Sequence, residues 1–207
     1  MVKGTAVKQN SSFYFERLRR GVELTAAILF VLLFSPLFLI ISILIKCDSK
    51  GPVIFKQVRG GKNGKHFVIY KFRTMSEELP YAGHDSSISL SDDRITRVGR
   101  VLRKTSLDEL PQIFNIIKGE MAFVGPRPTW TAQTDSYNER QKKRLLVKPG
   151  VTGLAQISGR NKLTWDEKIE IDLVYVEKKT IALDLYIILQ TFITVLRFEG
   201  VYHDVPK

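Results

Sequence analysis

Cysteine is almost absent from this sequence of 207 residues: Cys47 stands alone, so no disulfide can form within the chain. No internal repeat and no low-complexity tract stands out. Hydrophobic residues make up 44% of the chain and charged residues 26%, so we expect a folded core rather than global disorder. The length suits one compact domain with a short appendage.

Acidic residues are scarce relative to basic ones. The chain has 21 Asp and Glu against 32 Lys and Arg, which gives a formal net charge of +11. This excess favours anionic partners, namely nucleic acid, acidic lipid headgroups or phosphate-bearing substrates. Composition alone does not choose among the three.

Charge is missing altogether from residues 24–45, which are mostly Leu, Ile, Phe and Val. A helix of this length can cross a hydrocarbon core of about 30 Å. A secretory signal has a shorter apolar region of about 7–15 residues followed by small residues, whereas Lys46, Cys47 and Asp48 follow here. The segment therefore predicts stable membrane association.

The middle and the flanks of this apolar segment argue against a simple span. Pro36 removes a backbone donor and predicts a kink, and the Ser35 hydroxyl can bond the freed Leu32 carbonyl. Both flanks are basic, through Arg17, Arg19, Arg20, Lys46, Lys50, Lys56 and Arg59. The positive-inside tendency places both ends in the cytoplasm, which favours a re-entrant helix. An ordinary kinked transmembrane helix is the alternative.

The remaining chain predicts an α/β fold that is mostly helical with a small β-hairpin. Residues 53–58 and 67–72 are β-branched and aromatic runs, and turn-forming residues separate them. Lys71 and Arg73 share a face if the second strand continues. Residues 76–93 have few apolar anchors and predict a surface loop.

Hydrophobic periodicity and end signals predict the other elements. We expect a helix over 95–102, an amphipathic helix over 110–117 capped by Gly119, an extended run over 121–124, a helix opened by a Thr164–Glu167 capping box, and an apolar helix over 181–196. The last helix is too short for a comfortable membrane span. It is either a core helix or an interfacial helix, and we favour the interface.

Asp108 and Glu109 are adjacent carboxylates, and two structural interpretations compete for them. Ser106 and Glu109 match a capping box, which spacing alone favours. Pro111 argues against a helix that begins at Ser106, because it would remove a hydrogen bond beyond the first turn. A helix that begins at Asp108 tolerates Pro111 and holds an ionised, nucleophilic carboxylate at its positive end.

Basic residues around this acidic pair favour a diphosphate site. Arg103 precedes Asp108 by five residues, and Arg127 lies between two prolines that restrict its backbone. A glycine-punctuated loop over 148–160 ends in Arg160, and glycines permit close approach of a ligand to the backbone. Glu109 can hold Mg²⁺, which one or two carboxylates and substrate phosphates usually bind.

Several of these stretches, in order along the chain, resemble one known family. The matching residues are Gly51-Pro52-Val53, Lys71-Phe72-Arg73-Thr74-Met75, Arg103 to Gln112, Gly119-Glu120-Met121, Val124-Gly125-Pro126-Arg127-Pro128, and Pro149-Gly150 with Gly153, Gln156 and Gly159-Arg160. They resemble the small monotopic phosphoglycosyl transferases, the bacterial sugar transferase family of glycan assembly. The likeness runs from about Arg17 to the C-terminus, and the chain looks like the minimal form of the family.

The resemblance implies a monotopic membrane protein. Residues 1–50 would form the re-entrant helix and residues 51–207 a catalytic domain that faces the cytosol, at the bacterial inner membrane. The implied roles are Asp108 as nucleophile, Glu109 as catalytic Mg²⁺ ligand, Arg103 and Arg127 as phosphate-site residues, and Lys71, Arg73 and Arg160 as donor-nucleotide contacts.

The reaction that this implies is transfer of a phosphosugar from a UDP-sugar to polyprenol (undecaprenyl) phosphate, with release of UMP. A covalent Asp108 intermediate and direct attack by the lipid phosphate are the two routes. The alternatives in other classes are a non-catalytic membrane scaffold and a basic nucleic-acid binder. We expect no nucleic-acid partner, because aromatic and basic residues do not form a stacking stripe. The sugar, the glycan pathway and the oligomeric state, including a homodimer, stay open.

Overall fold

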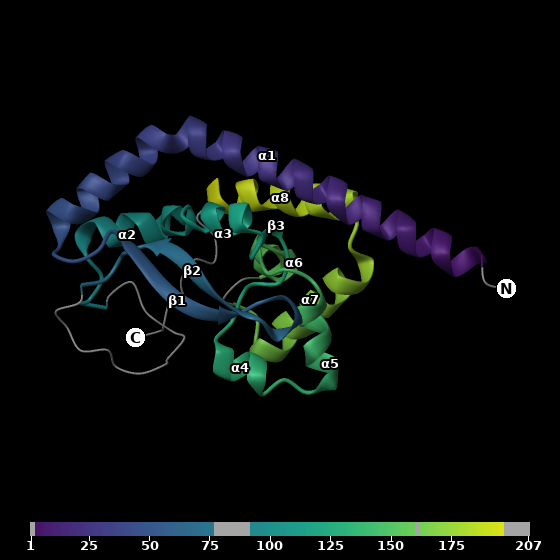
Figure 1. Ribbon diagram of the computed structural model, residues 1–207. Helices are drawn as coiled ribbons and strands as arrows, with labels where there is room; N and C mark the ends of the chain where they lie inside the picture. The colour runs from purple at the N-terminus through teal and green to yellow at the C-terminus, as the bar shows by residue number, and fades with distance from the viewer. Residues whose placement is uncertain (1–2, 77–91, 160–161, 197–207) are drawn as a thin grey trace.

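A computed structural model describes residues 3–76, 92–159 and 162–196 of the chain. One long helix, α1 (Lys3–Asp48), lies across a body of shorter helices and two small sheets (Figure 1). The shorter helices are α2 (Arg97–Lys104), α3 (Gln112–Lys118), α4 (Thr131–Asp135), α5 (Glu139–Lys142), α6 (Leu154–Ser158), α7 (Trp165–Lys178) and α8 (Ile181–Leu196). The predicted mixed fold, mostly helical with a small hairpin, is confirmed. The predicted loop over 76–93 lies almost wholly outside the described residues.

Helix α1 bends beyond its midpoint (Figure 1), and Pro36 lies inside it. Proline has no N–H to donate to the Leu32 carbonyl, and the Ser35 hydroxyl donates to that carbonyl instead at 2.9 Å. The predicted local repair of the broken hydrogen bond is therefore confirmed. Within the described residues, one helical segment, Arg17–Asp48, is long and apolar enough to cross a membrane.

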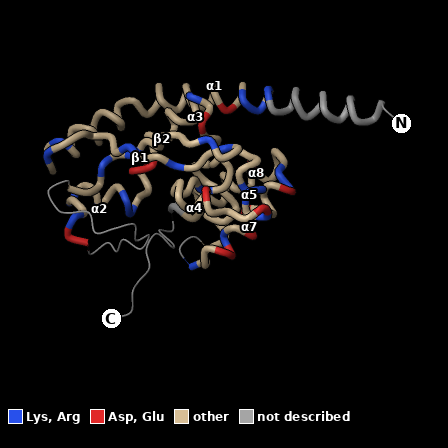
Figure 2. Tube along the Cα trace, turned by 60° about the horizontal axis from the view of Figure 1, so that its bottom comes forward, with Lys and Arg blue, Asp and Glu red and all other residues tan. Residues whose placement is uncertain are grey.

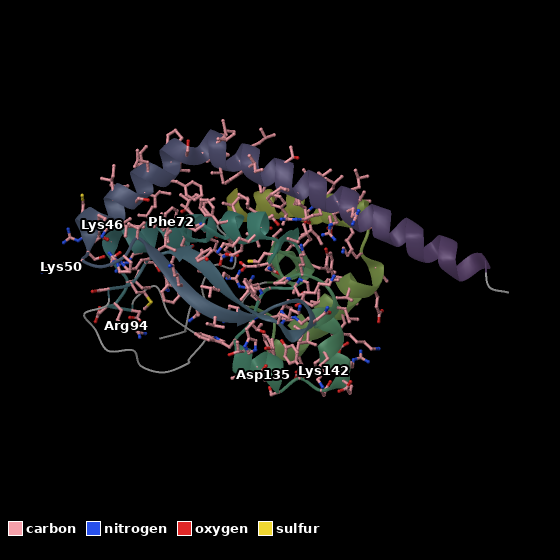
Figure 3. All side chains as sticks on the ribbon, in the orientation of Figure 1. Lys46, Lys50, Phe72, Arg94, Asp135 and Lys142 are labelled. Atoms are coloured by element: carbon pink, nitrogen blue, oxygen red, sulfur yellow. The ribbon has the colours of Figure 1, made fainter. Side chains whose placement is uncertain are left out.

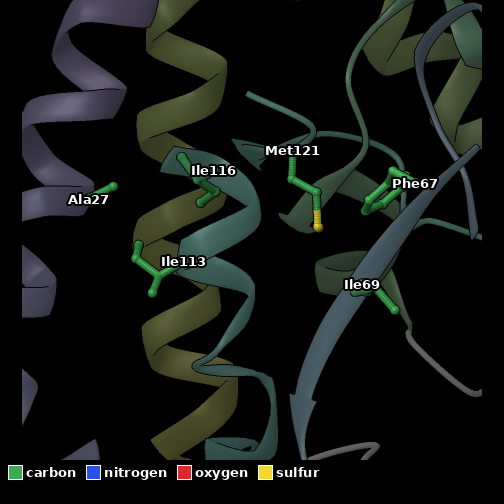
Figure 4. Close-up of a cluster of buried hydrophobic side chains, with 6 residues drawn as sticks. All are labelled: Ala27, Phe67, Ile69, Ile113, Ile116 and Met121. Atoms are coloured by element: carbon green, nitrogen blue, oxygen red, sulfur yellow. The ribbon is translucent and has the colours of Figure 1, made fainter. Parts of the chain in front are cut away.

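One face of α1 packs on the body while the other stays open. Ala27 is fully buried and points toward Ile113 and Ile116 of α3 (Figure 4). Ile41 and Ile45 are buried in a second cluster farther along the helix. The outward face exposes Leu18, Val22, Leu29, Leu32, Leu33, Leu39, Ile40, Ile43 and Leu44. Figure 2 shows that the central part of α1, which carries most of these exposed apolar side chains, has no charged residues.

Both ends of the apolar run are tied to this body. The Arg20 guanidinium donates to the carbonyls of Ile116 and Ile117 at 2.6 and 2.7 Å, where α3 ends. At the other end, Asp48 accepts from the Val98 backbone N–H at 2.8 Å. Lys46 and Lys50 lie beside this second attachment, at the end of α1 (Figure 3).

The predicted hairpin is confirmed as the antiparallel strands β1 (Ile54–Gly60) and β2 (His66–Phe72), paired from Ile54↔Phe72 to Gly60↔His66. A short 3₁₀ turn, η1 (Lys62–Gly64), joins them. Asn63 and Gly64 adopt positive φ there, which suits the residue types found in tight turns.

Asn115 of α3 lies against the free edge of β2. Its side-chain oxygen accepts from the Tyr70 backbone N–H at 3.1 Å, and its amide nitrogen donates to the Val68 carbonyl at 2.7 Å. Asn115 is fully buried. A helix side chain thus satisfies backbone groups that a third strand would otherwise pair.

A second sheet joins β3 (Ala122–Val124) to β4 (Gly150–Thr152) in parallel, which confirms the predicted extended run. Glycines allow the backbones of these two segments to approach closely. A Cβ on Gly150 would lie 2.1 Å from the Gly125 nitrogen, and one on Gly153 would lie 2.2 Å from the Gly125 carbonyl oxygen. Backbone packing therefore accounts for these two glycines of the 148–160 loop, and the approach of a ligand to this loop stays a prediction.

The helix ends agree closely with the sequence signals. Gly119 caps α3 at φ 84°, and Thr164 and Glu167 form the predicted capping box of α7. Helix α8 buries Ile187 and exposes Leu185, Leu189 and Phe192, so it has a core face and an open apolar face. Its place in a membrane interface stays a prediction.

Candidate active site

Asp108 and Glu109 lie in a short 3₁₀ turn, η2 (Leu107–Glu109), between α2 and α3. The leucines on either side, Leu107 and Leu110, pack against a core cluster that contains Phe72 and Leu102. Apolar anchors before and after the acidic pair therefore fix the turn on the core. The two carboxylates remain partly exposed at its surface.

Both sequence interpretations of the acidic pair are wrong. Ser106 has a left-handed backbone, φ 58°, and its side chain makes no capping hydrogen bond. Helix α3 begins at Gln112, directly after Pro111, so Asp108 does not occupy an α-helix N-terminus either. Pro111 nevertheless explains this boundary, because a residue that enters a helix needs no N–H donor.

Glu109 is held by two cations from distant parts of the chain. The Lys71 ammonium of β2 lies 2.8 Å from Glu109 Oε1. The Arg127 guanidinium lies 2.5 Å from Oε1 and 3.2 Å from Oε2, which is a bidentate arrangement. The Arg127 side chain is 48% exposed. The Arg127 guanidinium, beside the acidic pair, is therefore accessible to a ligand.

The pKa values of the two neighbouring carboxyls move in opposite directions. Burial raises the pKa of Asp108 to about 6, helped by the Glu109 charge and opposed by Lys71, Arg103 and Arg127. Burial also acts to raise the pKa of Glu109, but Arg127 and Lys71 outweigh it and hold that pKa well below its usual range. Glu109 is thus a fixed anion, and Asp108 titrates close to neutrality.

The other predicted site residues differ in position. The Arg103 Nε donates to Thr74 Oγ1 at 2.8 Å, and its charge acts on Asp108. β2 ends at Phe72, and Arg73 turns instead to the end of α1, where it bonds Ser49 O and Oγ at 2.7 and 2.9 Å. The structure therefore brings Lys71, Arg103 and Arg127 to the acidic pair and holds Arg73 at Ser49. Arg160 lies outside the described residues.

A buried network behind Arg127 was missed by the sequence analysis. Arg144 and Asp172 are 4% and 1% exposed and form an ion pair of 2.7 Å. Arg144 also donates to the Tyr137 hydroxyl at 2.7 Å and to the Arg127 carbonyl at 2.8 Å. The pair thereby fixes the backbone from which the Arg127 guanidinium projects.

A signal for this network was present in the sequence. Asp172 falls on the apolar side of its helix, three residues after the buried Ile169 and next to Leu173. A carboxylate on an apolar face needs a buried cationic or hydrogen-bonding partner. Which cation would meet it could not be read from spacing, because Arg144 lies 28 residues away.

The carboxylate oxygens of Asp108 and Glu109 are the candidate ligands for a divalent cation at this site. In the described part of the chain, no group of three or more His, Cys, Asp or Glu side chains is placed to hold a metal. Glu109 Oε1 already has two cationic partners, whereas Oε2 has one, which leaves a lone pair free. Such a donor set fits Mg²⁺ of the kind that substrate phosphates help to bind.

Comparison with known proteins places the chain among sugar transferases. The chain is 44% identical over 186 residues to the uncharacterized sugar transferase EpsL of Bacillus subtilis, which covers 89% of this chain and 90% of that protein. It is 40% identical to the UDP-glucose:undecaprenyl-phosphate glucose-1-phosphate transferase of Caulobacter vibrioides, covering 89% of this chain and 72% of that protein.

The chain also matches part of a longer protein. It is 36% identical to the undecaprenyl-phosphate galactose phosphotransferase of Salmonella typhimurium, over 97% of this chain but 44% of that protein. The family described as bacterial sugar transferase matches residues 14–198, a range that contains most of α1, the acidic pair and α8. The chain therefore belongs to the bacterial sugar transferase family.

Proposed function

We propose that this protein transfers a phosphosugar from a UDP-sugar to undecaprenyl phosphate at the cytoplasmic face of the bacterial inner membrane. The observation that carries the proposal is a fixed anion, Glu109, next to a titratable carboxyl, Asp108, with the charges of Lys71, Arg103 and Arg127 acting on the pair. The names of the relatives, which include undecaprenyl-phosphate phosphotransferases that act with glucose and galactose, support the substrate class.

The proposed chemistry has two steps, each an exchange at one phosphorus. An Asp108 carboxylate oxygen bonds to the phosphorus that bears the sugar, and the bond from that phosphorus to the UMP oxygen breaks with its electron pair. A phosphate oxygen of the lipid then bonds to the same phosphorus, and Asp108 leaves as a carboxylate. The products are UMP and undecaprenyl diphosphate-sugar.

The surrounding residues suit this exchange because they supply positive charge where phosphoryl oxygens would lie. Arg127 presents a half-exposed guanidinium, and the charges of Lys71 and Arg103 also act on Asp108. Bound through Glu109 and the donor phosphates, Mg²⁺ would neutralise further phosphoryl charge. Glu109 stays ionised throughout the working pH range, because Arg127 and Lys71 hold its pKa low.

The attachment of α1 supports a re-entrant helix rather than a span. Arg20 before the apolar run and Asp48 after it both bond to the same folded body. A helix that crossed the bilayer would place these two attachments on opposite sides of a core about 30 Å thick. The exposed apolar faces of α1 and α8 would then lie in the membrane and its interface.

The decisive experiment seeks the covalent intermediate. The purified protein, incubated with Mg²⁺ and a panel of UDP-sugars but no lipid, should gain the mass of one phosphosugar on Asp108 and release one UMP. Asp108→Asn should gain nothing, whereas Asp135→Asn, an exposed change on α4, should behave as wild type. Absence of the adduct with a donor that supports full turnover would exclude the covalent route.

Initial rates separate the covalent route from direct attack by the lipid phosphate. With both substrates varied, parallel lines in a double-reciprocal plot are expected for an enzyme that releases UMP before the lipid reacts. Intersecting lines would favour a ternary complex in which Asp108 only orients other groups. UMP release from none of the UDP-sugars would reject the transferase function itself.

A further inference from the structure

A second basic site lies away from the acidic pair, beneath the first part of α1. A cavity of about 90 Å³ opens there between α1, the hairpin turn η1, the chain before β4 and the end of α7. None of Lys71, Arg103, Asp108, Glu109 or Arg127 lines it. This volume could hold several water molecules, so it is large enough for a tetrahedral oxyanion.

The charge on the walls of this cavity is strongly one-sided. Five cationic side chains and one acidic side chain line it: Arg19, Arg20, Lys62, Lys148, Lys179 and Glu23. Glu23 pairs with Arg19 at 3.3 Å, and Asp184 pairs with the same arginine at 3.0 Å. The two hydrogen bonds of Arg20 to the carbonyls of Ile116 and Ile117 carry no neutralising charge, and Glu23 is the acidic group whose pKa its charge lowers. Even with Glu23 and Asp184 counted, the five cations outnumber the acidic groups around the cavity, so the cavity favours an anionic ligand.

The position of the cavity suggests what this anion is. Leu18 and Val22, on the same helical turns as Arg19 and Arg20, are 68% and 63% exposed, and the apolar run begins at residue 24. Cations at the start of a membrane-inserted apolar run lie at the level of lipid headgroups. The cavity therefore opens where phosphate groups are concentrated.

We infer that this cavity is a binding site for a phosphate group, supplied by the headgroup of an acidic membrane lipid. Arg19 and Arg20 form its wall on α1, and Lys62, Lys148 and Lys179 close on the phosphate from the body. The bound lipid stabilises the contact between the part of α1 before Pro36 and the domain that carries the acidic pair. Only the lipid source of the phosphate rests on the membrane association proposed above; the site itself does not.

Two double variants of equal charge test the site. Lys62→Gln/Lys179→Gln removes two lining cations. Lys65→Gln/Lys178→Gln removes neighbouring cations at the end of η1 and at the end of α7, and neither of these lines the cavity. Both variants lose the same net charge, so general attraction to anions falls equally. A difference between them reports the cavity alone.

The thermal midpoint of each full-length protein in neutral detergent is measured against inorganic phosphate, phosphatidylglycerol and phosphatidylcholine. Wild type and Lys65→Gln/Lys178→Gln should be stabilised saturably by phosphatidylglycerol and not by phosphatidylcholine. Lys62→Gln/Lys179→Gln should need about thirtyfold more phosphatidylglycerol, since each lysine contributes roughly five- to sixfold in affinity.

The outcomes distinguish the two sources of phosphate. Saturation by inorganic phosphate with no response to lipid supports the site but assigns it to a soluble phosphate compound. Equal weakening in both double variants, or no saturable response of wild type to either anion, overturns the inference. No turnover is measured, so failure here and failure of the proposed transferase function remain distinguishable.

Discussion

At the scale of single residues, Asp108 combines a reactive position with a cost in stability. Burial raises its pKa from an ordinary value near 4 to about 6, so the folded protein holds the proton more tightly than the unfolded chain. This preference stabilises the fold at low pH, and the stabilisation is lost as the pH rises from about 4 through 6. Above pH 6 the folded protein carries a charge in a poorly solvated place.

Asp108→Asn should therefore stabilise the protein at pH 7.5 by about 1–2 kcal/mol, because the neutral amide avoids this charge. For a chain of this length we expect the thermal midpoint to rise by roughly 2–8 °C. Near pH 4 the gain should vanish. Differential scanning calorimetry of both proteins at the two pH values checks the sign, and a destabilised variant at pH 7.5 would contradict it.

The pH dependence of the first chemical step should follow the same carboxyl group. Only ionised Asp108 can attack phosphorus, so single-turnover UMP release should rise about tenfold per pH unit below 6 and level off above 7. Glu109 should not contribute to this profile, since its pKa is held far below the window. A flat profile between pH 5 and 8, with chemistry still limiting, would remove Asp108 from the role of nucleophile.

At the scale of elements, the Arg144–Asp172 pair joins α7 to the loop that carries Arg127. Arg144→Met leaves a buried carboxylate without its partner and should cost about 3–5 kcal/mol of stability. In Arg144→Met/Asp172→Leu, apolar side chains replace both charges, and most of that stability should return. Urea unfolding of the three proteins measures this coupling.

Activity should not return with stability in that double variant. The Arg127 carbonyl still lacks its donor, so its guanidinium is held less firmly, and we expect KM for the donor to rise roughly tenfold with a smaller change in kcat. Steady-state rates at fixed lipid concentration give this split. Full recovery of KM in the double variant would reduce Arg144 to a purely structural residue.

Local signals predicted most elements, and long-range pairing decided what they missed. The Thr164–Glu167 box and the Gly119 cap depend on neighbouring residues only, and both are present. The turn at Asp108 was predicted wrongly because Glu109 is drawn to Lys71 and Arg127, which lie 38 and 18 residues away. Capping rules consider only residues a few positions apart, so they do not include the attraction of Glu109 to distant cations.

At the scale of the whole molecule, the attachment of both ends of the apolar run makes a topological prediction. Cys47 is exposed beyond the run, and a side chain at Gly21, before the run, would meet no atom within 4 Å. If the helix is re-entrant, wild-type Cys47 and the cysteine of Cys47→Ser/Gly21→Cys should both react with an impermeant maleimide in inside-out vesicles only. A spanning helix would expose them on opposite sides.

The labelling experiment has a control in the same vesicles. Cys47→Ser alone should remain unlabelled in either orientation, because the chain then has no thiol. After detergent is added, the two single-cysteine proteins should label to the same extent. Labelling of one site from each side would refute the re-entrant helix while leaving the assignment of the acidic pair untouched.

Asn115 has a consequence for how copies of this protein meet. Exposed strand edges recruit further strands, from any chain that comes near. In β2 the backbone groups of Val68 and Tyr70 are already engaged by an amide carried on a helix. The outer edge of β2 is thereby protected from edge-to-edge growth into aggregates, a hazard that rises when proteins are crowded into the two dimensions of a membrane surface.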